Sequence, residues 1–446
     1  MHYHRLKVDI PTLQAETDGL LSQIGGLIGR LGHGSPPRYE RYGQQVAYQQ
    51  ALVRRLELQM TIIAPMKAGK STIINSIVGQ ELLPSHSAAM TTLPTELVLK
   101  AGLSEPVLLI NPQLFAEFQG LLQHLQEQIQ RKGMAWAEQE TRHYPHLKGV
   151  LRQLEAGFAL AEKTTGSHAV TERLTGLNHV LRLARLLSPN HSSLSLTTLP
   201  RIETPFWQDS SNIQWPEQNH LVIVDTPGPN EAGEHNLKEV VTKQIEQSSL
   251  VLIVLDFTQL KNEAAEQIKQ TVQQVINLRG INNLYVLVNK VDQRRAGHDM
   301  TQEEVRQFVA ADLGVTNPKH IFEISAMQAF WAATLLRELQ QSPDIRLREL
   351  EAARKVAELL FGIRWQKQLD ALSKEQMREE ALYLWQHSGF PAFLNRALNT
   401  LVSEAPHRAL RTALQTSQNC LRDIRQEIPL RNERWQEGWR DFEAAQ

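Results

Sequence analysis

The chain has 446 residues, of which 41% are hydrophobic, and a formal net charge of −1. This length allows two or three domains with a large core, and the balanced charge excludes a strong overall attraction to nucleic acid or anionic lipid. The single cysteine, Cys420, cannot form an intrachain disulfide, and the sequence shows neither a signal peptide nor an apolar run long enough to span a bilayer; we therefore expect a cytoplasmic protein with only peripheral membrane contacts.

Two helices are predicted before the first strand, and we assign residues 1–56 to the N-terminal part of a helical bundle. Residues spaced alternately four and three apart predict a helix over 12–31 that packs on another helix. This expected stripe consists of Leu13, Thr17, Leu20, Ile24, Leu27 and Leu31. The Gly-Ser-Pro-Pro sequence at 34–37 ends the helix, and a second helix is predicted over 39–56.

A strand predicted over 58–63 leads into a phosphate-binding loop at residues 64–72. Gly69 lets the backbone approach the phosphates, Lys70 adds positive charge near the β and γ phosphates, and the Ser71 hydroxyl is placed to hold Mg²⁺. The helix that begins at the end of this loop points its positive end at the nucleotide. The residues expected to line the nucleotide here are Ala64, Met66, Lys67, Ala68, Gly69, Lys70, Ser71 and Thr72.

A switch loop is expected at residues 90–95, before a strand predicted over 96–100. A threonine in this loop would ligate Mg²⁺ only when the γ-phosphate is bound, which orders the loop. We prefer Thr91 for this role, with Thr92 as the alternative, and an ordinary polar loop is the competing interpretation. A further strand is predicted over 106–110, and residues 112–200 are expected to form a helical insertion beside the switch.

The second half of the phosphate site is predicted at the end of a buried strand over 221–225. Asp225 would hold the water shell of the Mg²⁺, and the Gly228 N–H would contact the γ-phosphate. The alternative interpretation is an aspartate that only caps a following helix. Ligands of an α/β sheet bind at the carboxyl ends of its strands, so the position of Asp225 favours the phosphate site.

The base-binding motif, Asn-Lys-Val-Asp at 289–292, follows strands predicted over 250–255 and 284–288. The Asp292 carboxylate would accept two hydrogen bonds from guanine N1 and N2, a pair of donors that adenine lacks. Asn289 would tie this loop to the phosphate loop, and the stem of Lys290 would cover one face of the base. A strand over 320–324 ends at Ser325 and Ala326, where a backbone N–H would meet guanine O6. We therefore predict a GTPase and not an ATPase.

The rest of the chain is predicted to be helical. We expect the GTPase domain over 57–335 and a C-terminal helical neck or stalk segment over 336–446, which packs with the N-terminal helices as one bundle. A helix starts near the Ser-Gly-Phe-Pro sequence at 388–391, and Pro406 is expected to break it. The arginines of the last helix are balanced by acidic residues, so no direct nucleic-acid binding is expected.

Four segments resemble those of bacterial dynamin-like GTPases: residues 66–72, 90–94, 225–233 and 288–292. The resemblance covers nearly the whole chain and implies an α/β P-loop GTPase domain with a mostly parallel sheet, a helical insertion and a flanking α-helical bundle. It also implies GTP, GDP and Mg²⁺ as ligands, and GTPase domains that form a homodimer or a higher self-assembly. A peripheral membrane and a replication protein are further candidate partners, which would place the protein at the membrane or the nucleoid.

Two positions depart from the pattern of eukaryotic dynamins. Met66 stands where those proteins have a glutamine that orients water, and Lys67 stands where they have a serine that helps to hold a monovalent cation. The resemblance implies a monovalent cation as one more candidate ligand, although Lys67 replaces the serine that helps to hold it. Lys67 is itself a candidate source of positive charge, within the chain or across a dimer. A lysine that merely faces solvent is an equally good reading of Lys67.

The first functional hypothesis is GTP hydrolysis coupled to a conformational cycle. Lys70 and the loop N–H groups would stabilise the transition state, and backbone near Thr91 and Gly228 would position the attacking water. The second hypothesis is a slow, GTP-gated scaffold that recruits a chromosomal or replication partner. A third, a ribosome-assembly GTPase, is weaker because no RNA-binding module is evident after Ala326.

Overall fold

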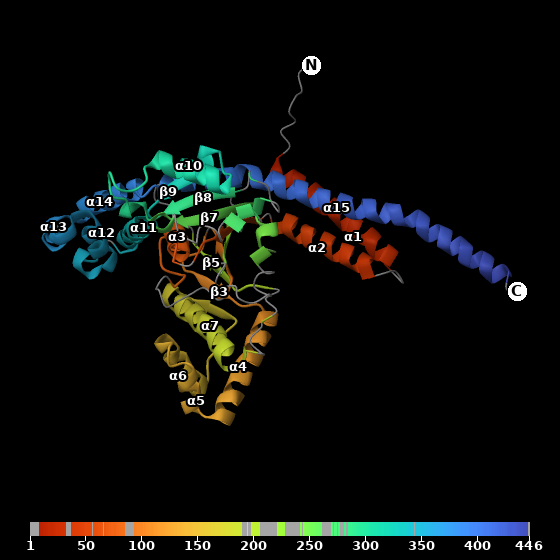
Figure 1. The fold of residues 1–446 in the computed structure, drawn as a ribbon, viewed down its shortest axis with the longest axis horizontal. Coiled ribbons are helices and arrows are strands. Elements are labelled where there is room, and N and C mark those ends of the chain that lie inside the picture. Colours follow the sequence, from red (N-terminus) through yellow and green to blue (C-terminus); the bar gives the residue numbers. More distant parts are fainter. Residues whose placement is uncertain are drawn as a thin grey trace, which may run out of the picture. The chain divides into compact units, whose positions relative to one another are not determined.

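The computed structural model describes the chain except for residues 1–8, 33–36, 56, 66, 85–92, 101, 190–193, 195–197, 206–220, 228–240, 243, 261–268, 271, 274, 277–280, 282–283, 343 and 445–446. The chain folds as two compact units. The first unit comprises residues 1–58, 215–220 and 400–446, and the second comprises residues 59–214 and 221–399. Figure 1 shows the elements of both units.

The first unit is a group of helices with one apolar cluster. Its helices are α1 (Ile10–Gly32), α2 (Pro37–Arg55) and the C-terminal part of α15 (Phe390–Ala444). The cluster is formed by Leu21, Ile24, Ile28, Tyr39, Val46, Val53, Leu410, Ala413 and Ile424. Residues from both ends of the sequence thus share one core, and the Tyr42 hydroxyl lies 3.5 Å from the Asp423 carboxylate at its edge.

The buried face of α1 differs from the stripe expected from the sequence. Leu20, Leu27 and Leu31 are 45%, 46% and 40% exposed, whereas Leu21 and Ile28 are fully buried. Thr17, Leu21, Ile24 and Ile28 follow the 3.6-residue helical period. At 100° per residue, the three exposed leucines lie roughly 50 to 90° around the helix from the centre of this face. The expected stripe is therefore correct for Leu13, Thr17 and Ile24, which are buried or pack against the cluster. It is wrong for Leu20, Leu27 and Leu31, because two apolar stripes run side by side along α1.

The second unit is built around a mixed nine-stranded sheet in the described part of the chain. The strands follow the order β4-β3-β5-β2-β6-β1-β7-β8-β9 across the sheet. Their bounds are β1 (Leu58–Ile63), β2 (Thr95–Leu99), β3 (Val107–Leu109), β4 (Lys163–Thr165), β5 (Arg201–Thr204), β6 (Leu221–Asp225), β7 (Leu250–Asp256), β8 (Leu284–Asn289) and β9 (Ile321–Ile324).

Parallel pairing dominates the half of the sheet that contains β1. Strands β1, β7, β8 and β9 pair in parallel in that order, and β2 pairs in parallel with β5. The pairs β2–β6, β3–β4 and β3–β5 are antiparallel. The carboxyl ends of β1, β7, β8 and β9 therefore lie at one edge of the sheet, which is where α/β sheets bind ligands.

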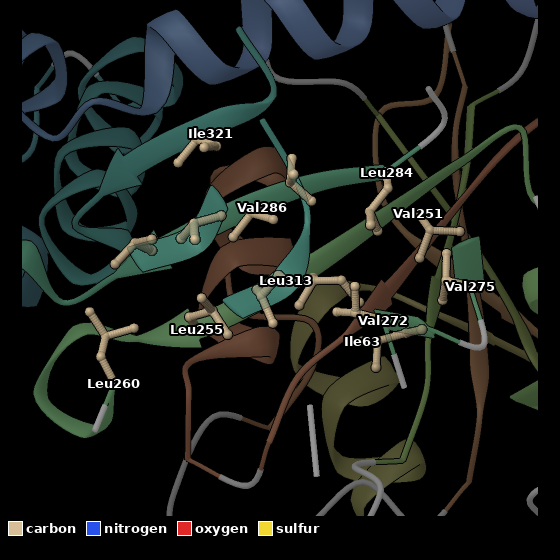
Figure 2. Packing of buried hydrophobic residues seen from close by; sticks show 14 of the residues in the cluster. Ile63, Val251, Leu255, Leu260, Val272, Val275, Leu284, Val286, Leu313 and Ile321 are labelled. Carbon is tan, nitrogen blue, oxygen red and sulfur yellow. The ribbon is translucent and has the colours of Figure 1, made fainter. Parts of the chain in front are cut away.

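One large apolar cluster of this unit lies on the parallel strands (Figure 2). Ile63, Val251, Val286 and Ile321 from four strands pack with residues of other segments, including Val272, Val275 and Leu313. Alternate residues of the same strands, such as Leu252 and Leu287, are also fully buried. Both faces of these strands are therefore covered, as their continuous apolar sequences require.

Helices fill the rest of the second unit. They are α3 (Lys70–Val78), α4 (Pro112–Lys132), α5 (Met134–Glu140), α6 (Lys148–Ala156), α7 (Ser167–Leu187), α10 (Gln302–Leu313), α11 (Ala326–Gln341), α12 (Glu351–Phe361), α13 (Trp365–Ala371) and α14 (Lys374–His387). Short 3-10 helices are η1 (Pro145–Leu147), η3 (Phe257–Gln259), η5 (Val291–Gln293), η6 (Pro318–His320), η7 (Leu347–Glu349) and η8 (Gly362–Arg364). Among the helices that the structure describes, none combines the length and apolarity of a membrane span.

The sequence predicted seven of the nine strands and the helical character of the insertion. It missed β4 and β5, which lie within the insertion expected over 112–200 and directly after it. Helices α4 to α7 of the insertion contact one another, and the Asn111 side chain caps α4 by accepting from the Leu114 N–H at 2.8 Å. The insertion is therefore mainly helical, but it also contributes β4, the strand at one edge of the sheet.

The C-terminal helices differ from the expected division of the chain in two ways. The second unit continues to Asn399, beyond the boundary expected near residue 335, because α11 packs against α12 and α14. Helix α15 starts at Phe390 as expected but continues through Pro406, so the predicted break is wrong. A proline inside a helix removes one hydrogen bond and costs about 3 kcal/mol, a local loss that does not end the helix here. Pro406 itself is buried.

Candidate nucleotide-binding site

The phosphate-binding loop connects β1 to α3 and requires glycine at position 69. Gly69 has φ +94° and stands directly before α3, and a Cβ at this position would overlap Nδ2 of Asn289. Ala64 and Ala68 are buried, whereas Lys67 is exposed and has a left-handed backbone with φ 67°. No side chain of the described residues caps the start of α3, so its backbone N–H groups face the loop as an anion site requires. Met66 lies outside the described residues.

Lys70 and Asp225 come together although they are 155 positions apart in the sequence. Lys70 Nζ donates to Asp225 Oδ1, and the two residues are 8% and 2% exposed. The next residue, Thr226, donates its hydroxyl to the Ile62 carbonyl at 2.8 Å and so holds the end of β6 against β1. Ser71 and Thr72 are half-buried beside them at the start of α3. Thr91, Thr92 and Gly228 lie outside the described residues.

Asn289 connects the ends of three strands. Its Nδ2 donates to the Ala68 carbonyl of the phosphate loop at 2.8 Å, the contact that the sequence led us to expect. Its Oδ1 accepts the Ala326 N–H at 2.9 Å, after β9. The Ala326 carbonyl in turn accepts from the Ser76 hydroxyl of α3 at 3.0 Å. One buried amide therefore sets the spacing between the phosphate loop and the loop after β9.

The remaining residues of the motif at 289–292 lie on the open side of the site. Lys290 has φ 68°, and its Nζ donates to Asp256 at the end of β7 at 2.6 Å. Asp256 also accepts from the Thr258 N–H at 2.9 Å. Asp292 lies in η5 and is exposed, so its carboxylate is accessible to a base. This lysine–aspartate pair was not foreseen, because nothing in the sequence links residues 256 and 290.

The N–H groups after β9 already have protein acceptors. Ser325 N–H donates to the Ser388 carbonyl at 2.8 Å, and Ala326 N–H donates to Asn289. Contact of either N–H with guanine O6 would therefore require a shared hydrogen bond. The Ser325 side chain caps α11 by accepting from the Gln328 N–H at 3.3 Å, so its principal role in this structure is to start that helix.

These residues fit a magnesium-bound nucleoside triphosphate. The glycine that admits no Cβ, the buried lysine and a helix start that no described side chain caps are suited to a polyphosphate. Ser71 and Asp225 carry oxygens of the kind that Mg²⁺ prefers. Among the described residues, no group of three or more His, Cys, Asp or Glu side chains could hold a metal alone.

Comparison with known proteins identifies the family. The Dynamin family profile matches residues 61–290, which includes the phosphate loop, Asp225 and the strands up to Lys290. The chain belongs to the dynamin family. The dynamin-type GTPase fold expected from the sequence, with its helical insertion and largely parallel sheet, is therefore confirmed.

Curated relatives of this dynamin-family chain include the clamp-binding protein CrfC of Escherichia coli and of its strain K12. Each is 31% identical over 385 residues, which is 85% of this chain and 51% of the relative. The chain thus spans about half the length of the curated relatives it matches.

Among solved structures, an oligomerised bacterial dynamin pair described in the long-range sensing and tethering of membranes is 16% identical, with a TM-score of 0.40 over 96% of this chain and 58% of the other. A variant of Era from Aquifex aeolicus, bound to GDP·AlF4−, is 14% identical, with a TM-score of 0.28 over 68% of this chain and 67% of the other.

Sequence reasoning missed three contributions to this dynamin-family site. Asp256 holds Lys290, Glu323 forms an ion pair with Arg294 just after the base-binding motif, and Ser388 accepts from Ser325. The acidic residue that ends β7 was visible in the sequence as the last residue of an apolar run. The other two depend on contacts between distant segments that no local pattern encodes.

Proposed function

We propose that this dynamin-family chain binds GTP with Mg²⁺ at the ends of β1, β6, β8 and β9, hydrolyses it, and couples hydrolysis to self-association and to movement of the helical bundle. The observation that carries the proposal is the Asn289 side chain. It joins the phosphate loop to the loop after β9 through two hydrogen bonds of 2.8 and 2.9 Å, and it stands three residues before Asp292. Phosphate binding and base binding are therefore parts of one site.

The residues of the site divide the work between the base and the phosphates. Asp292 would accept the two guanine donors, and the Lys290 stem, held by Asp256, would cover one face of the base. Lys70 forms an ion pair with Asp225 in this structure and would contact the β and γ phosphates when the nucleotide is bound. The buried lysine would therefore have a negative partner with and without nucleotide, as a buried charge requires. The N–H groups at the start of α3 would stabilise charge that develops on the transferred phosphoryl group.

Ser71, Asp225 and Thr91 would hold the Mg²⁺, which supplies charge neutralisation between the β and γ oxygens when it is bound. Backbone near Thr91 and Gly228 would orient the attacking water. Lys67 is exposed beside the loop and would add positive charge, in cis or from a second copy. Its location beside the loop supports this role, because a methionine at position 66 lacks the side-chain amide with which the glutamine of eukaryotic dynamins orients water.

The helices that join both ends of the chain support the coupling part of the proposal. The cluster around Leu21 and Ile424 combines residues from the first and last helices into one core, as a transmitted movement requires. Self-association is the partner relationship that family membership favours. A peripheral membrane surface is a second proposed target, and both assignments are consistent with a cytoplasmic chain.

The test of this proposal is GTP turnover measured against protein concentration, with and without anionic liposomes. We expect the rate per molecule to rise with concentration, because paired GTPase domains complete the site. A rate per molecule that stays constant over a hundredfold range, with and without liposomes, would contradict coupling to self-association while leaving simple hydrolysis intact.

A second candidate is a slow, GTP-gated scaffold, and the name of the CrfC relatives favours it. In this case the chain would bind a replication clamp or another chromosomal partner in the GTP state and turn over slowly. Capture of purified clamp by the GTP-loaded chain, but not by the GDP-loaded chain, together with a rate that is independent of protein concentration, would favour this candidate over the first.

A further inference from the structure

The turn before α15 is packed directly against the backbone of β9. Gly389 has φ +73°, and a Cβ there would overlap the carbonyl oxygen of Glu323. The preceding carbonyl, that of Ser388, accepts the Ser325 N–H at 2.8 Å. The turn therefore contacts β9 on both sides of Ile324, immediately before the loop that ends at Ala326.

The first turn of α15 is fixed to the same strand by aromatic contacts. Phe390 and Phe393 are fully buried, and the rings of Phe322 and Phe393 lie edge to face with centroids 5.7 Å apart. The Arg396 guanidinium lies over the Phe322 ring, with its Cζ 5.7 Å from the ring centroid. Because these residues belong to β9 and α15, a shift of one element displaces the other.

Glu323 also holds the base-binding loop. Its carboxylate accepts from both Nη1 and Nη2 of Arg294, with the Nη1 contact at 3.1 Å, and its side chain is 9% exposed. The Arg294 guanidinium also lies over the Phe257 ring at 4.6 Å, and Phe257 follows the Asp256 that binds Lys290. A bidentate, largely buried pair fixes both position and orientation, so Arg294 anchors the loop two residues after Asp292.

We infer that Arg294, Glu323 and Gly389 form one support through which the start of α15 sets the position of Asp292 and the affinity for the guanine base. This inference rests on the proposed function, because it assigns Asp292 to the base. Arg294 and Glu323 act as positioning residues and do not touch the nucleotide. Glu323 is the shared member, with its carboxylate on the base loop and its carbonyl on the turn.

Coupling of this kind works in both directions. If the turn stabilises the base-binding loop, then a bound nucleotide must stabilise the turn by the same factor. Nucleotide binding would therefore protect the backbone amides at the start of α15 from hydrogen exchange. This readout uses the unmodified chain and does not depend on any variant folding.

The test is calorimetric binding of GDP and IDP, in Mg²⁺, by the full chain and by matched variants. IDP lacks the guanine N2 donor, so the ratio of its Kd to that of GDP reports the second hydrogen bond to Asp292. Gly389→Ala is compared with Gly314→Ala, because Gly314 has the same φ of +73° but no described residue near a Cβ. Arg294→Gln and Glu323→Gln are compared with Arg348→Gln, which removes an exposed pair with Asp370.

We expect Arg294→Gln, Glu323→Gln and Gly389→Ala each to weaken GDP binding about tenfold with unchanged stoichiometry, while both control variants bind as the parent does. The Arg294→Gln, Glu323→Gln double variant should bind as each single variant does, since both remove one interaction. The preference for GDP over IDP should fall in the Arg294 and Glu323 variants. Loss of folded protein alone would not change this preference.

Three results would overturn the inference: GDP binding by the pair variants within twofold of the parent, the same result for a folded Gly389→Ala, or hydrogen exchange at the start of α15 that GDP does not change. If Gly389→Ala does not fold, the hydrogen-exchange measurement on the unmodified chain decides whether the turn before α15 is coupled to the nucleotide. Failure of the proposed function is a separate outcome, because the unmodified chain would then bind no GDP at all.

Discussion

Two residues at the centre of the site adopt backbone conformations that suit few side chains. Gly69 and Lys67 both have positive φ, and Gly69 also leaves no space for a Cβ beside Asn289. Glycine at position 69 is a steric requirement of the fold. The conformation of Lys67, by contrast, leaves a lysine side chain exposed next to the phosphate loop. These positions therefore test different parts of the account.

Gly69→Ala should abolish measurable GTP turnover and weaken GDP binding at least a hundredfold, because the new Cβ would push Asn289 away from the phosphate loop. Gly314→Ala is the control, since Gly314 has the same left-handed conformation, with φ +73°, and no described residue near a Cβ. It should retain turnover and lose only about 1 kcal/mol of stability. Steady-state turnover and calorimetry check both, and normal turnover by Gly69→Ala would contradict the placement of the loop.

Lys67→Ala should slow GTP turnover of the concentrated chain at least tenfold and change GDP affinity less than threefold. An added positive charge acts mainly on the transition state, where comparable groups contribute factors of about 10³ to 10⁵. Lys67→Arg should keep most of the rate because it preserves the charge. If Lys67→Ala turns over GTP as fast as the parent at every protein concentration, Lys67 is only a solvent-exposed lysine.

At the scale of elements, the sequence predicted the buried apolar strands correctly but did not predict the short polar strand β4. The apolar strands β1, β6, β7 and β8 were located within one residue, because they are buried on both faces. Strand β4, Lys163–Thr165, has no large apolar residue and lies at the edge of the sheet, so its sequence carries no signal. Helix α1 shows the complementary failure, in which two apolar stripes compete.

Leu21→Ala should destabilise the first unit by about 2 to 5 kcal/mol, because Leu21 is fully buried in its cluster. Leu20→Ala, one position away and 45% exposed, should change stability by less than about 0.5 kcal/mol. Urea unfolding followed by circular dichroism compares them. Equal losses from the two substitutions would show that the sequence-derived stripe, with Leu20 inside, is the right one.

The helical insertion should lose stability as the pH falls. Burial, with help from the nearby charges of His146 and Arg182, lowers the pKa of His179 to about 4 from an ordinary value near 6.5. The unfolded chain therefore takes up a proton between pH 6.5 and 4 that the folded chain refuses, and stability is lost across this window on acidification.

The check is the thermal midpoint of His179→Gln against that of the parent between pH 7 and 4. The advantage of the parent in thermal midpoint should shrink or reverse as the pH falls. The variant has no histidine at position 179, so it does not lose the stability that the parent loses when this histidine is protonated in the unfolded chain. His168→Gln, which replaces an exposed histidine of the same helix, should follow the parent's pH dependence. A His179→Gln profile parallel to that of the parent would contradict the assignment.

At the scale of the whole molecule, the site depends on contacts between segments that are distant in sequence. The motifs at 64–72, 225 and 289–292 could be recognised locally, because phosphate and base binding require fixed residue types at fixed spacing. The Ser388 contact to Ser325 and the ion pair of Arg294 with Glu323 could not, since each depends on how distant segments of the chain meet at β9. Motifs thus located the chemistry, and the structure was needed to find its support.

The central claim is that one site, formed by four strand ends, selects guanine through Asp292. Its most direct test is calorimetric titration of the full chain with GDP and with ADP in Mg²⁺, beside the Asp292→Asn variant and an Asp299→Asn control in the loop that follows. We predict that GDP binds with a stoichiometry of one, that ADP shows no binding at millimolar concentration, and that only Asp292→Asn loses GDP affinity, by about a hundredfold or more. Equal affinities for GDP and ADP, or GDP binding that Asp292→Asn leaves unchanged, would contradict the account.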